Sequence, residues 1–393
     1  MMNALHAQDG GDTFQHRAGR LKPLALQLLA VALFAASGGA NAATYAYTDL
    51  GTLGGTSSYA RGINDVGQIV GESHITGDFL HSTLWNGATA IDLAPALGPP
   101  TSSASGINSA GHTVGSRGIT ETTYHATLWT GTTATDLGTL GGESSYARGI
   151  NNAGQVVGAS YTKDGYSMRA TLWNGSTTTD LGTLDGGAVS YAEAINDAGQ
   201  VVGSSDITGH TANHATLWNG TTAIDLGTLG GTSSYAHDIN SAGQVVGKSQ
   251  ITGDTFFHAT LWNGTTATDL GGLSGFDSYA RAINDAGLVV GVSSLTARFP
   301  SPTAQRATLW SGSTAIDLNS FLDASTQNAG WHLMDATAIN NNGWIVGDAY
   351  NSMTGVQHAY LLTPVPEPST YVMTLAGLGL LRFAVRRSTS VKA

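Results

Sequence analysis

Residues 145–182 read SYARGINNAGQVVGASYTKDGYSMRATLWNGSTTTDLG, the clearest copy of a pattern that extends through most of the chain. The stretch holds short apolar and β-branched runs, such as Val156-Val157 and Thr171-Leu172-Trp173. Tight-turn signals separate these runs, namely Asn151-Asn152-Ala153-Gly154 and Asn174-Gly175. No window shows the 3.6-residue period of a helix, so the pattern predicts four β-strands joined by turns.

The pattern recurs in seven copies. An Ile-Asn pair marks each copy, mostly 43–45 residues after the one before, at Ile63-Asn64, Ile107-Asn108, Ile150-Asn151, Ile195-Asn196, Ile239-Asn240, Ile283-Asn284 and Ile339-Asn340. Seven units of about 44 residues with four strands each are typical of a β-propeller that has one four-stranded sheet per blade. We therefore predict an all-β fold, a single seven-bladed β-propeller, with helices only in a signal peptide and a C-terminal segment. A β-solenoid and an open array of small β-domains are the alternatives.

The two ends of the repeat region are complementary. Residues 45–51 match a fourth strand without its first three, and residues 358–362 match a third strand without its fourth. The N-terminal strand would then complete the last blade, close the ring and cover an exposed sheet edge. A solenoid has no need of complementary ends, so this feature favours the propeller.

The order of strands predicts two different faces. The segment equivalent to residues 146–151 has small residues, which suit the crowded axis, so we expect it to be the innermost strand. The Asn-x-x-Gly and Asn-Gly turns then lie on one face, and Asn-Gly predicts a two-residue type I′ hairpin. Loops of variable length follow the valine-rich run on the opposite face, and such loops are where binding residues most often lie.

Composition excludes several classes of protein. The chain has 393 residues, of which 53 are glycine, 11% are charged and none is cysteine. Disulfides, thiolate zinc sites and a cysteine nucleophile are therefore excluded. Residues 43–364 hold nine Lys and Arg against 24 Asp and Glu, a formal charge of −15, which repels nucleic acid.

The N-terminus has the features of an export signal. Basic residues precede the apolar run Leu24–Ala36, and Ala40-Asn41-Ala42 supplies the small residues that a signal peptidase requires. We therefore expect residues 1–42 to be a signal peptide. A short membrane anchor is the alternative, although the run is too short to span a bilayer comfortably.

The C-terminus combines four features. Pro366, Glu367 and Pro368 precede a short apolar segment, residues 371–385, and Arg386 and Arg387 follow it. Prolines exclude regular helix from the linker, and a basic end after an apolar segment is a stop-transfer arrangement. The combination resembles the PEP-CTERM sorting signal of exported proteins of Gram-negative bacteria.

That resemblance implies a route for the protein. It implies recognition by an exosortase, cleavage near Pro366, Glu367 and Pro368, transient anchoring in the inner membrane, and delivery to the cell surface or the medium. The domain organisation then comprises a signal peptide at 1–42, a propeller at 43–363, and a sorting segment at 364–393 that contains a short transmembrane helix. The expected partners during export are signal peptidase and an exosortase.

The repeats resemble a second family. Copies such as His125-Ala126-Thr127-Leu128-Trp129 and His214-Ala215-Thr216-Leu217-Trp218 occur beside Asp-Leu-Gly-Thr-Leu-Gly-Gly and Ile-Asn-x-x-Gly-x-Val-Val-Gly segments. They resemble the HAF family of extracellular repeats, with Thr where that motif has Phe. The resemblance implies an exported repeat protein and no defined activity.

Residues that recur in every unit are expected to be structural. Histidines on separate blades cannot converge on one ion, so we expect each repeated histidine to hydrogen-bond within its own blade, to the repeated aspartate or a tryptophan nitrogen. Metal ligation is the minor alternative, and no metal site is assigned. The repeated tryptophans are expected to fill the core between blades, with exposed sugar-stacking platforms as the alternative.

Residues that break the repeat are the binding candidates. Aromatic side chains near carboxylates and hydroxyls suit carbohydrate or protein recognition, because sugar faces stack on rings while polar groups fix orientation. The candidates are Phe79, Tyr124, Tyr161, Tyr166, Phe256, Phe257 and Tyr350. No cofactor is expected. Calcium is a weaker alternative on loops 75–78 and 251–254, which lack the dense carboxylates of a strong calcium site.

These features predict an exported, non-enzymatic binding or matrix module at the cell surface or outside the cell, linked to exopolysaccharide or biofilm, with exopolysaccharide or other surface proteins as partners. One alternative is a carbohydrate-active hydrolase that uses carboxylates such as Asp78, Glu121, Asp206 or Asp254. The other alternative is a purely structural surface protein.

Overall fold

The computed structural model describes residues 44–365, apart from 78, 88, 95–100, 208, 210, 211 and 298–300. These residues form β-strands almost throughout, which confirms the all-β prediction. Five sheets have four strands each and a sixth has eight. Within each four-strand unit, consecutive strands pair antiparallel in chain order.

The strands follow the predicted pattern of four per repeat. In the eight-stranded sheet they are β2 (Gly54–Ile63), β3 (Gln68–Ile75), β4 (Leu80–Asn86), β5 (Thr89–Asp92), β26 (Trp331–Ile339), β27 (Ile345–Asn351), β28 (Gln357–Val365) and β1 (Thr44–Asp49). The next two sheets contain β6 (Ser102–Ile107), β7 (Thr113–Gly118), β8 (Tyr124–Thr130) and β9 (Thr133–Asp136), then β10 (Gly141–Ile150), β11 (Val156–Thr162), β12 (Met168–Asn174) and β13 (Thr177–Asp180).

The remaining three sheets repeat the same order. They contain β14 (Ser190–Ile195), β15 (Gln200–Asp206), β16 (Asn213–Asn219) and β17 (Thr222–Asp225), then β18 (Gly230–Ile239), β19 (Gln244–Ile251), β20 (Phe257–Asn263) and β21 (Thr266–Gly271), and finally β22 (Ser278–Ile283), β23 (Val289–Ser294), β24 (Gln305–Ser311) and β25 (Thr314–Asp317).

The eight-stranded sheet joins the two ends of the repeat region. β1 pairs antiparallel with β28 over six residues, from Thr44 opposite Val365 to Asp49 opposite Tyr360. A single parallel bridge, between Ser57 and Gln357, connects this group of four strands to β2–β5. The pairing of the first strand with the last is the one that the complementary ends predict.

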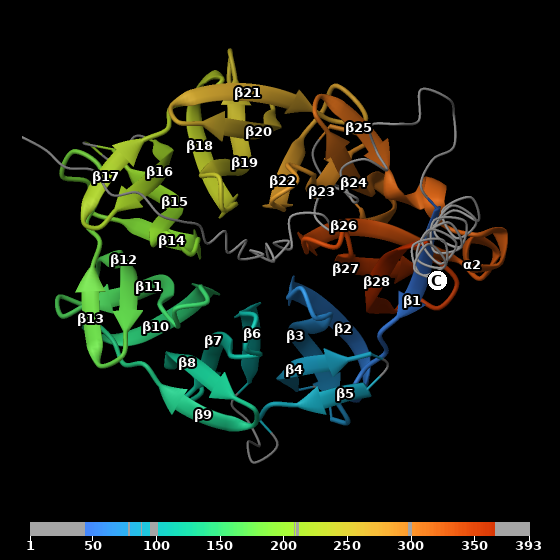
Figure 1. Ribbon diagram of the computed structural model, residues 1–393, viewed down its shortest axis with the longest axis horizontal. Helices are drawn as coiled ribbons and strands as arrows, with labels where there is room; N and C mark the ends of the chain where they lie inside the picture. Colours follow the sequence, from blue (N-terminus) through green and yellow to red (C-terminus); the bar gives the residue numbers. More distant parts are fainter. Residues whose placement is uncertain are drawn as a thin grey trace, which may run out of the picture. The chain divides into compact units, whose positions relative to one another are not determined.

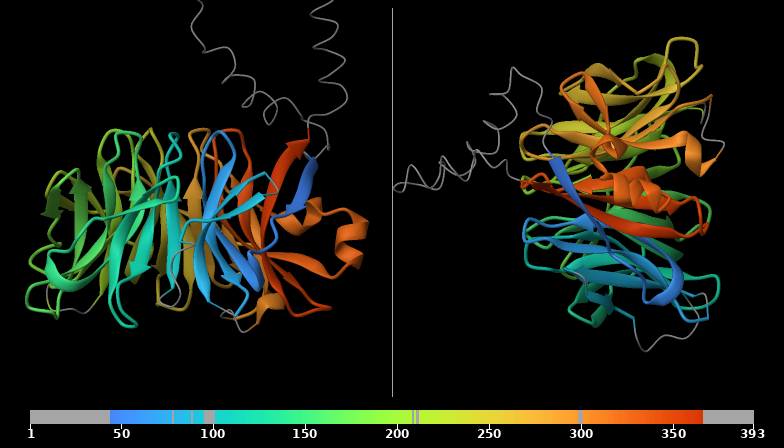
Figure 2. Two further views of the ribbon diagram at one scale, coloured as in Figure 1. Left: turned by 90° about the horizontal axis from the view of Figure 1, so that it is seen from below. Right: turned by 90° about the vertical axis from the view of Figure 1, so that its right-hand side faces the viewer.

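The sheets lie side by side around a centre (Figure 1). The first strand of each four-strand unit is nearest to the centre and the fourth is outermost, and the side views show loops gathered on two opposite faces (Figure 2). The seven Ile-Asn pairs at the ends of the innermost strands line one common pocket. This arrangement places residues that are about 44 positions apart in sequence next to one another.

Tryptophans fill the spaces between neighbouring sheets. The repeated tryptophans are no more than 2% exposed, namely Trp85, Trp129, Trp173, Trp218, Trp262 and Trp310. Trp218, on β16, packs with Val157, Ala170 and Leu181 of the preceding sheet. The predicted core role is therefore confirmed, and burial excludes the sugar-platform alternative for these six side chains.

The repeated histidines bind the repeated aspartates, as expected. In each pair the His Nδ1 donates to an Asp carboxylate on the next strand, at 2.7–2.9 Å, in His81–Asp92, His125–Asp136, His214–Asp225, His258–Asp269 and His358–Asp49. The last pair connects β28 to β1. The tryptophan nitrogens are not the partners, because all six are buried without a hydrogen-bond partner among the described residues.

Two expectations about local structure are wrong. Helices are not confined to the chain ends, because Pro302–Ala304 (η1) and Leu318–Phe321 (η2) are 3₁₀ turns and Ala324–Asn328 (α2) is a short α-helix. The cause is a longer spacing before the last unit, which leaves room for a turn of helix that Asp323 caps by accepting from the Thr326 N–H.

The second correction concerns the hairpin after each tryptophan. Asn174 pairs with Thr177, so the two loop residues are Gly175 and Ser176, and only Gly175 has a positive φ, of 60°. A type I′ turn needs positive φ at both loop positions, whereas type II′ needs it only at the first. The turn is therefore of type II′, and asparagine belongs to the strand.

Candidate functional site

Each innermost strand carries a β-bulge at the same position. In β10 the register with β11 shifts between Ala147 and Gly149, so Arg148 is the extra residue. A bulge turns a side chain out of the regular alternation of a strand. The same shift occurs in every unit, and the seven bulge residues are Arg61, Ser105, Arg148, Glu193, His237, Arg281 and Thr337.

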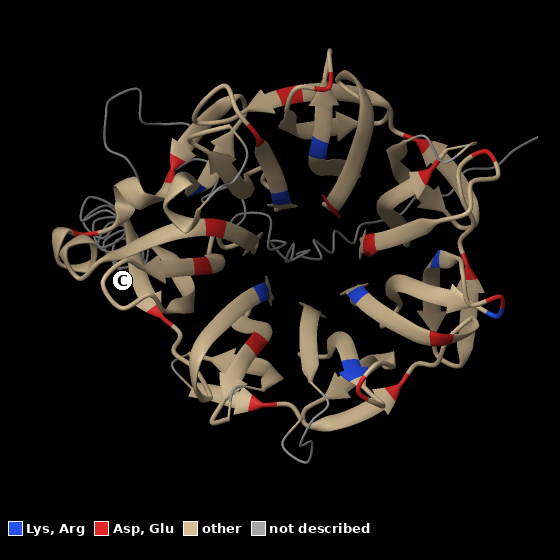
Figure 3. Cartoon of the chain, turned by 180° about the vertical axis from the view of Figure 1, so that it is seen from behind, with Lys and Arg blue, Asp and Glu red and all other residues tan. Residues whose placement is uncertain are grey.

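All seven bulge residues line one central cavity of about 500 Å³. Glu72, Ser103, Ala104 and Asp335 complete its lining. Charged residues of both signs lie on the inner strands around the centre (Figure 3). The cavity can therefore offer hydrogen-bond donors and acceptors to one ligand.

Two of the cavity arginines are paired with carboxylates. Arg61 donates to Glu72 at 2.9 Å and to Asp348 at 3.3 Å. Arg281 donates to the Asp335 Oδ2 through Nε at 3.2 Å and lies 3.1 Å from it through Nη2. These contacts hold the last unit, which contains Asp335 and Asp348, to the units on both sides.

Arg148 has a different environment. Its side chain is 53% exposed, and its Nε lies 3.9 Å from the Glu193 Oε2, beyond hydrogen-bond distance. The loss of solvation in the cavity raises the pKa of Glu193, against the lowering effect of Arg148 and Arg281. The guanidinium of Arg148 thus keeps its donors available.

Burial changes the titration of two more side chains at the cavity. It raises the pKa of Asp348 to about 7, although Arg61 acts in the opposite direction. It lowers the pKa of His237 to about 3, and Arg281 adds to that effect. The imidazole of His237 is therefore neutral near pH 7 and donates from Nδ1 to the Ala280 carbonyl at 2.6 Å.

A group of tyrosines lies beside the bulge residues. Two residues before the bulge, five of the seven units carry the tyrosines that we call the mouth tyrosines: Tyr59, Tyr146, Tyr191, Tyr235 and Tyr279. Because each innermost strand runs from the variable-loop face towards the Asn turn, these residues lie nearer to the variable-loop face than the bulge residues do. These tyrosines are not among the predicted binding residues, because residues that recur from unit to unit were expected to be structural.

Cations lie against the mouth tyrosines. Lys248 Nζ is 5.1 Å from the ring centroid of Tyr235, 5.1 Å from that of Phe257 and 4.3 Å from that of Tyr279. Burial lowers the pKa of Lys248 to about 8. Arg61 lies over Tyr59 at 5.4 Å. Such contacts are attractive because the ring face carries negative charge.

A smaller pocket of about 230 Å³ adjoins the central cavity. It is lined by two mouth tyrosines and small or flexible side chains, and it shares Arg148 and Glu193 with the cavity; the others are Tyr146, Ala159, Met168, Tyr191 and Ala192. We call it the Arg148 pocket. It combines apolar walls with one cation and one carboxyl group.

The structure brings some of the predicted aromatic residues to this region. The ring of Tyr124 stacks on Tyr146 with centroids 6.1 Å apart, and Phe257 contacts Tyr235 and Tyr279 at 6.0 and 6.3 Å. Tyr161, on β11, is opposite Met168, which lines the Arg148 pocket.

The other predicted aromatic residues lie elsewhere. Phe256 packs edge-on against Phe276, and Tyr350 packs edge-on against His332. Phe79 and Tyr166 are exposed loop residues and line none of the pockets described here; Tyr166 is 91% exposed. Pro366, Glu367 and Pro368 lie outside the described residues.

The loop carboxylates named for a hydrolase do not line the cavity. The Asp206 carboxylate accepts from the backbone of Ala188 and Val189, and that of Asp254 accepts from Thr232. Glu121 is exposed, and Asp78 lies outside the described residues. The acidic residues of the cavity are Glu72, Glu193 and Asp335. The sequence does contain a signal for Glu193. The position that holds arginine in three other repeats, as Arg148 does in its own, holds a glutamate here.

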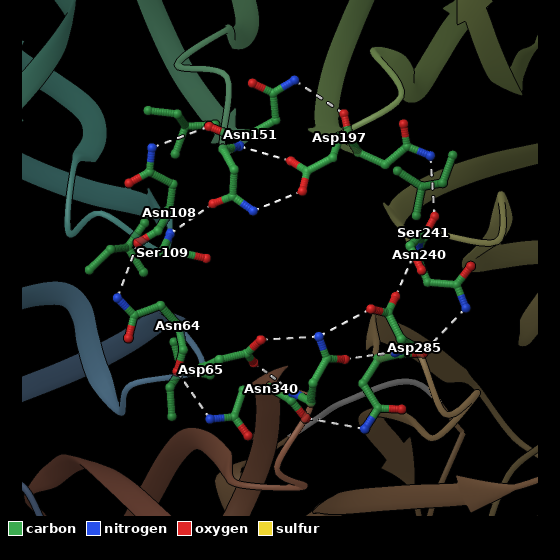
Figure 4. Close-up of a pocket in the computed structure, with 18 of the residues that line it drawn as sticks. Asn64, Asp65, Asn108, Ser109, Asn151, Asp197, Asn240, Ser241, Asp285 and Asn340 are labelled. Carbon is green, nitrogen blue, oxygen red and sulfur yellow. Dashed lines mark hydrogen bonds between the residues drawn. The ribbon is translucent and has the colours of Figure 1, made fainter. Parts of the chain in front are cut away.

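A polar pocket of about 230 Å³ lies at the end of the central axis where the Asn turns meet, opposite the mouth tyrosines (Figure 4). The side-chain amide of each repeated asparagine donates to the backbone carbonyl of the next, from Asn64 through Asn108, Asn151, Asn196, Asn240, Asn284 and Asn340 back to Asn64. The neighbouring carboxylates accept hydrogen bonds, as Asp65 does from the Asn341 N–H. Within the described residues, no group of three His, Asp or Glu side chains is placed to hold a metal ion.

Comparison with protein families identifies the C-terminal segment. Residues 364–388 match the model for the PEP-CTERM protein-sorting motif. The chain carries a sorting signal of exported proteins. The resemblance seen in the sequence is thereby confirmed, and the motif implies export, sorting by an exosortase and association with a membrane during that step. In the part of the chain that the structure describes, no helix is both long and apolar enough to cross a bilayer.

A second family model matches residues 232–361 and is described as a protein of unknown function, DUF3466. No curated protein matches the chain. The HAF resemblance stays a prediction.

Several solved structures are similar at low sequence identity. TolB from Acinetobacter baumannii has a TM-score of 0.42 and 11% identity, over 77% of this chain and 65% of that one. The β-propeller domain of the trilobed protease from Pyrococcus furiosus has a TM-score of 0.48 and 10% identity, over 77% of this chain and 95% of that one. Trypanosoma rangeli sialidase has a TM-score of 0.41 and 12% identity, over 87% of this chain and 60% of that one. This chain thus spans less than two thirds of the TolB and sialidase chains.

Proposed function

We propose that residues 43–363 are a single seven-bladed β-propeller, closed by the N-terminal strand. Three contacts support closure: the pairing of β1 with β28, the His358–Asp49 pair, and the hydrogen bond from Asn340 to Asn64. The one parallel bridge between β2 and β28 is then a contact between neighbouring blades, which makes the eight-stranded sheet two blades.

We propose that this propeller is a non-enzymatic binding module of the cell surface or the extracellular matrix. Its ligand is a carbohydrate chain of the exopolysaccharide or biofilm type, held at the variable-loop end of the central cavity. The observation that carries this proposal is a cavity lined by arginine, glutamate, histidine and hydroxyl side chains, with the mouth tyrosines beside its bulge residues and two of them lining the adjoining Arg148 pocket.

The chemistry of this lining supports a sugar ligand. Aromatic rings stack on the apolar faces of sugar rings, and paired donors and acceptors fix the hydroxyl groups. Two arginines of the cavity, Arg61 and Arg281, are already held by carboxylates, so their positions are set before a ligand arrives. A preformed site avoids part of the entropy cost of binding.

The export route completes the proposal. Residues 1–42 are removed by signal peptidase, and residues 364–393 hold the protein in the inner membrane until an exosortase cleaves near Pro366, Glu367 and Pro368. The propeller is then released to the surface or the medium. The match to the sorting motif supports this order of events.

A glycan array with the purified full chain tests the binding role. We expect saturable binding, and we expect Tyr191→Ala to reduce it about tenfold, because removing a stacking ring costs about 1–2 kcal/mol. Tyr166→Ala tests the exposed loop instead, and Met353→Ala, a 71% exposed apolar residue, is the control. Binding that depends on Tyr166 but not on Tyr191 would place the site on the loops. No binding to any glycan would favour protein partners or a purely structural role.

A hydrolase is the second candidate, because Glu72, Glu193 and Asp335 line the same cavity. Paired carboxyl groups are the usual machinery of glycoside hydrolysis. A reducing-sugar assay on each glycan that binds separates the two functions. Release of reducing ends, lost in Glu193→Gln, would replace the binding module with the enzyme.

A further inference from the structure

Basic residues are concentrated at the cavity, although the protein is acidic. Residues 43–364 contain nine Lys and Arg, and four of these lie at the cavity or its mouth tyrosines: Arg61, Arg148, Lys248 and Arg281. Their partners differ. Arg61 and Arg281 hydrogen-bond to carboxylates, and Lys248 is surrounded by three rings.

Arg148 is the arginine of this group with no carboxylate at hydrogen-bond distance among the described residues. Glu193 is 3.9 Å away and the Arg148 side chain is half exposed, so the guanidinium remains accessible to a ligand. A guanidinium binds a carboxylate through two parallel hydrogen bonds, which adds geometric selectivity to charge attraction.

The walls around Arg148 fit one sugar ring. Tyr146 and Tyr191 come from neighbouring innermost strands, and both line the Arg148 pocket with Met168. Tyr146 is also stacked on Tyr124, which restricts the motion of its ring. A volume of about 230 Å³ is below the range of about 300–1,000 Å³ for drug-sized ligands, so the pocket suits a single monosaccharide unit.

We infer that the Arg148 pocket binds a uronic acid residue of the glycan, with its carboxylate on Arg148 and its ring against Tyr146 or Tyr191. This inference rests on the proposed function and adds the class of sugar. Glu193, whose Oε2 lies 3.9 Å from the Arg148 Nε, accepts from a hydroxyl of the same sugar. The central cavity then receives the neighbouring sugar, because Arg148 and Glu193 line both spaces.

Isothermal titration calorimetry on the full chain tests this inference with two matched probes. Trigalacturonate and trigalactose differ in the carboxylate, and hexaglutamate supplies carboxylates without a sugar. We expect trigalacturonate to bind at least tenfold more tightly than trigalactose. Arg148→Met should reduce trigalacturonate affinity by about 10- to 100-fold, the effect of losing a charge-assisted hydrogen bond, and leave trigalactose within about twofold.

Lys163→Met is the matched control, since it removes one positive charge from an exposed loop of the same repeat. Equal affinity for the two sugars, or a loss in Lys163→Met as large as in Arg148→Met, overturns the inference and leaves the binding function intact. Binding of hexaglutamate as tight as that of trigalacturonate overturns the sugar class in favour of an acidic peptide. Failure of every glycan, on the array as well as in the calorimeter, overturns the proposed function together with this inference.

Discussion

At the scale of single residues, a buried carboxyl group behind the cavity residue Arg61 is in an unfavourable environment. Asp348 is 7% exposed, its Oδ2 accepts from Arg61, and its Oδ1 has no hydrogen-bond partner among the described residues. Asp335 lies directly opposite it on β26. Burial and this second carboxylate together disfavour the ionised form, which Arg61 only partly restores.

Stability should therefore fall with pH over a defined window because of Asp348. Its pKa is about 7 in the folded chain and about 3.9 in an unfolded one. Between these values the folded state holds a proton that the unfolded state has released. The contribution of Asp348 to the free energy of unfolding is therefore fully present below about pH 4 and is lost as the pH rises towards 7. The slope is at most about 1.4 kcal/mol per pH unit.

Urea unfolding at pH 4.5, 5.5, 6.5 and 7.5 measures this effect. We expect the decrease to be smaller in Asp348→Asn, which does not titrate. Asp238, whose pKa burial also raises to about 7, titrates in both proteins and cancels in the comparison. Asp164→Asn is the control, because hydrogen bonds lower the pKa of Asp164 to about 2, outside the window. Identical slopes in the parent and Asp348→Asn would contradict the prediction.

At the scale of elements, each β-bulge is coupled to a glycine on the next strand. A Cβ at Gly158 would lie 2.0 Å from the Tyr146 carbonyl oxygen, because the bulge at Arg148 moves the backbone of β10 over β11. The equivalent glycines have the same contact at 1.9–2.0 Å, namely Gly71, Gly115, Gly203, Gly247, Gly291 and Gly347. The glycine of the Val-Val-Gly motif is thus what permits the bulge that turns a side chain into the cavity.

Gly158→Ala should therefore destabilise the protein by about 3 kcal/mol or more, because the backbone oxygen cannot move without breaking the bulge. Gly275→Ala should change stability by no more than about 0.5 kcal/mol, since its new Cβ would have nothing within 4 Å and its φ is not positive. Thermal and urea unfolding compare the two. A Gly158→Ala protein as stable as the Gly275→Ala protein would show that the bulge is not rigid.

This coupling also explains what the sequence could predict. Strand order and the burial of tryptophans such as Trp218 follow from repeated turns and apolar runs, so they could be predicted. The bulge could not, because the recurring glycine does not reveal its cause, which is the contact between Gly158 and the Tyr146 carbonyl on the neighbouring strand. The central cavity could therefore not be predicted, whereas exposed loop residues such as Tyr166 were predicted as binding residues.

At the scale of the whole molecule, the two ends of the repeat region meet through a His–Asp contact that four other units make internally. Asp49 accepts from His358, on β28, and from the Gly51 N–H. Asp136 accepts from His125 and from the Gly138 N–H, with both partners in its own part of the chain. The local chemistry is the same, so the two aspartates form a matched pair for testing closure.

Asp49→Asn and Asp136→Asn should each lose about 1 kcal/mol of local hydrogen bonding. The consequence differs, because β1 is joined to β28 by non-covalent contacts only, whereas a two-residue hairpin joins β9 to β8. In Asp49→Asn we expect amide hydrogen exchange in β1 and along its edge of β28 to rise about fivefold, and in Asp136→Asn we expect exchange to rise in β9 only. Equal and local effects in both variants would show that β1 does not close the ring.

The cycle of asparagine hydrogen bonds has a consequence for the gene. Near-identical tandem repeats in DNA recombine out of register, which adds or deletes whole copies. A linear stack tolerates such a change, because each unit contacts only its neighbours. Here the side-chain amide of Asn340 must reach the backbone carbonyl of Asn64, and the distance between them depends on the total rotation from the first unit to the seventh. A product with six or eight copies must close the cycle at a different angle between units, so the geometry of this cycle disfavours a change in the number of repeats.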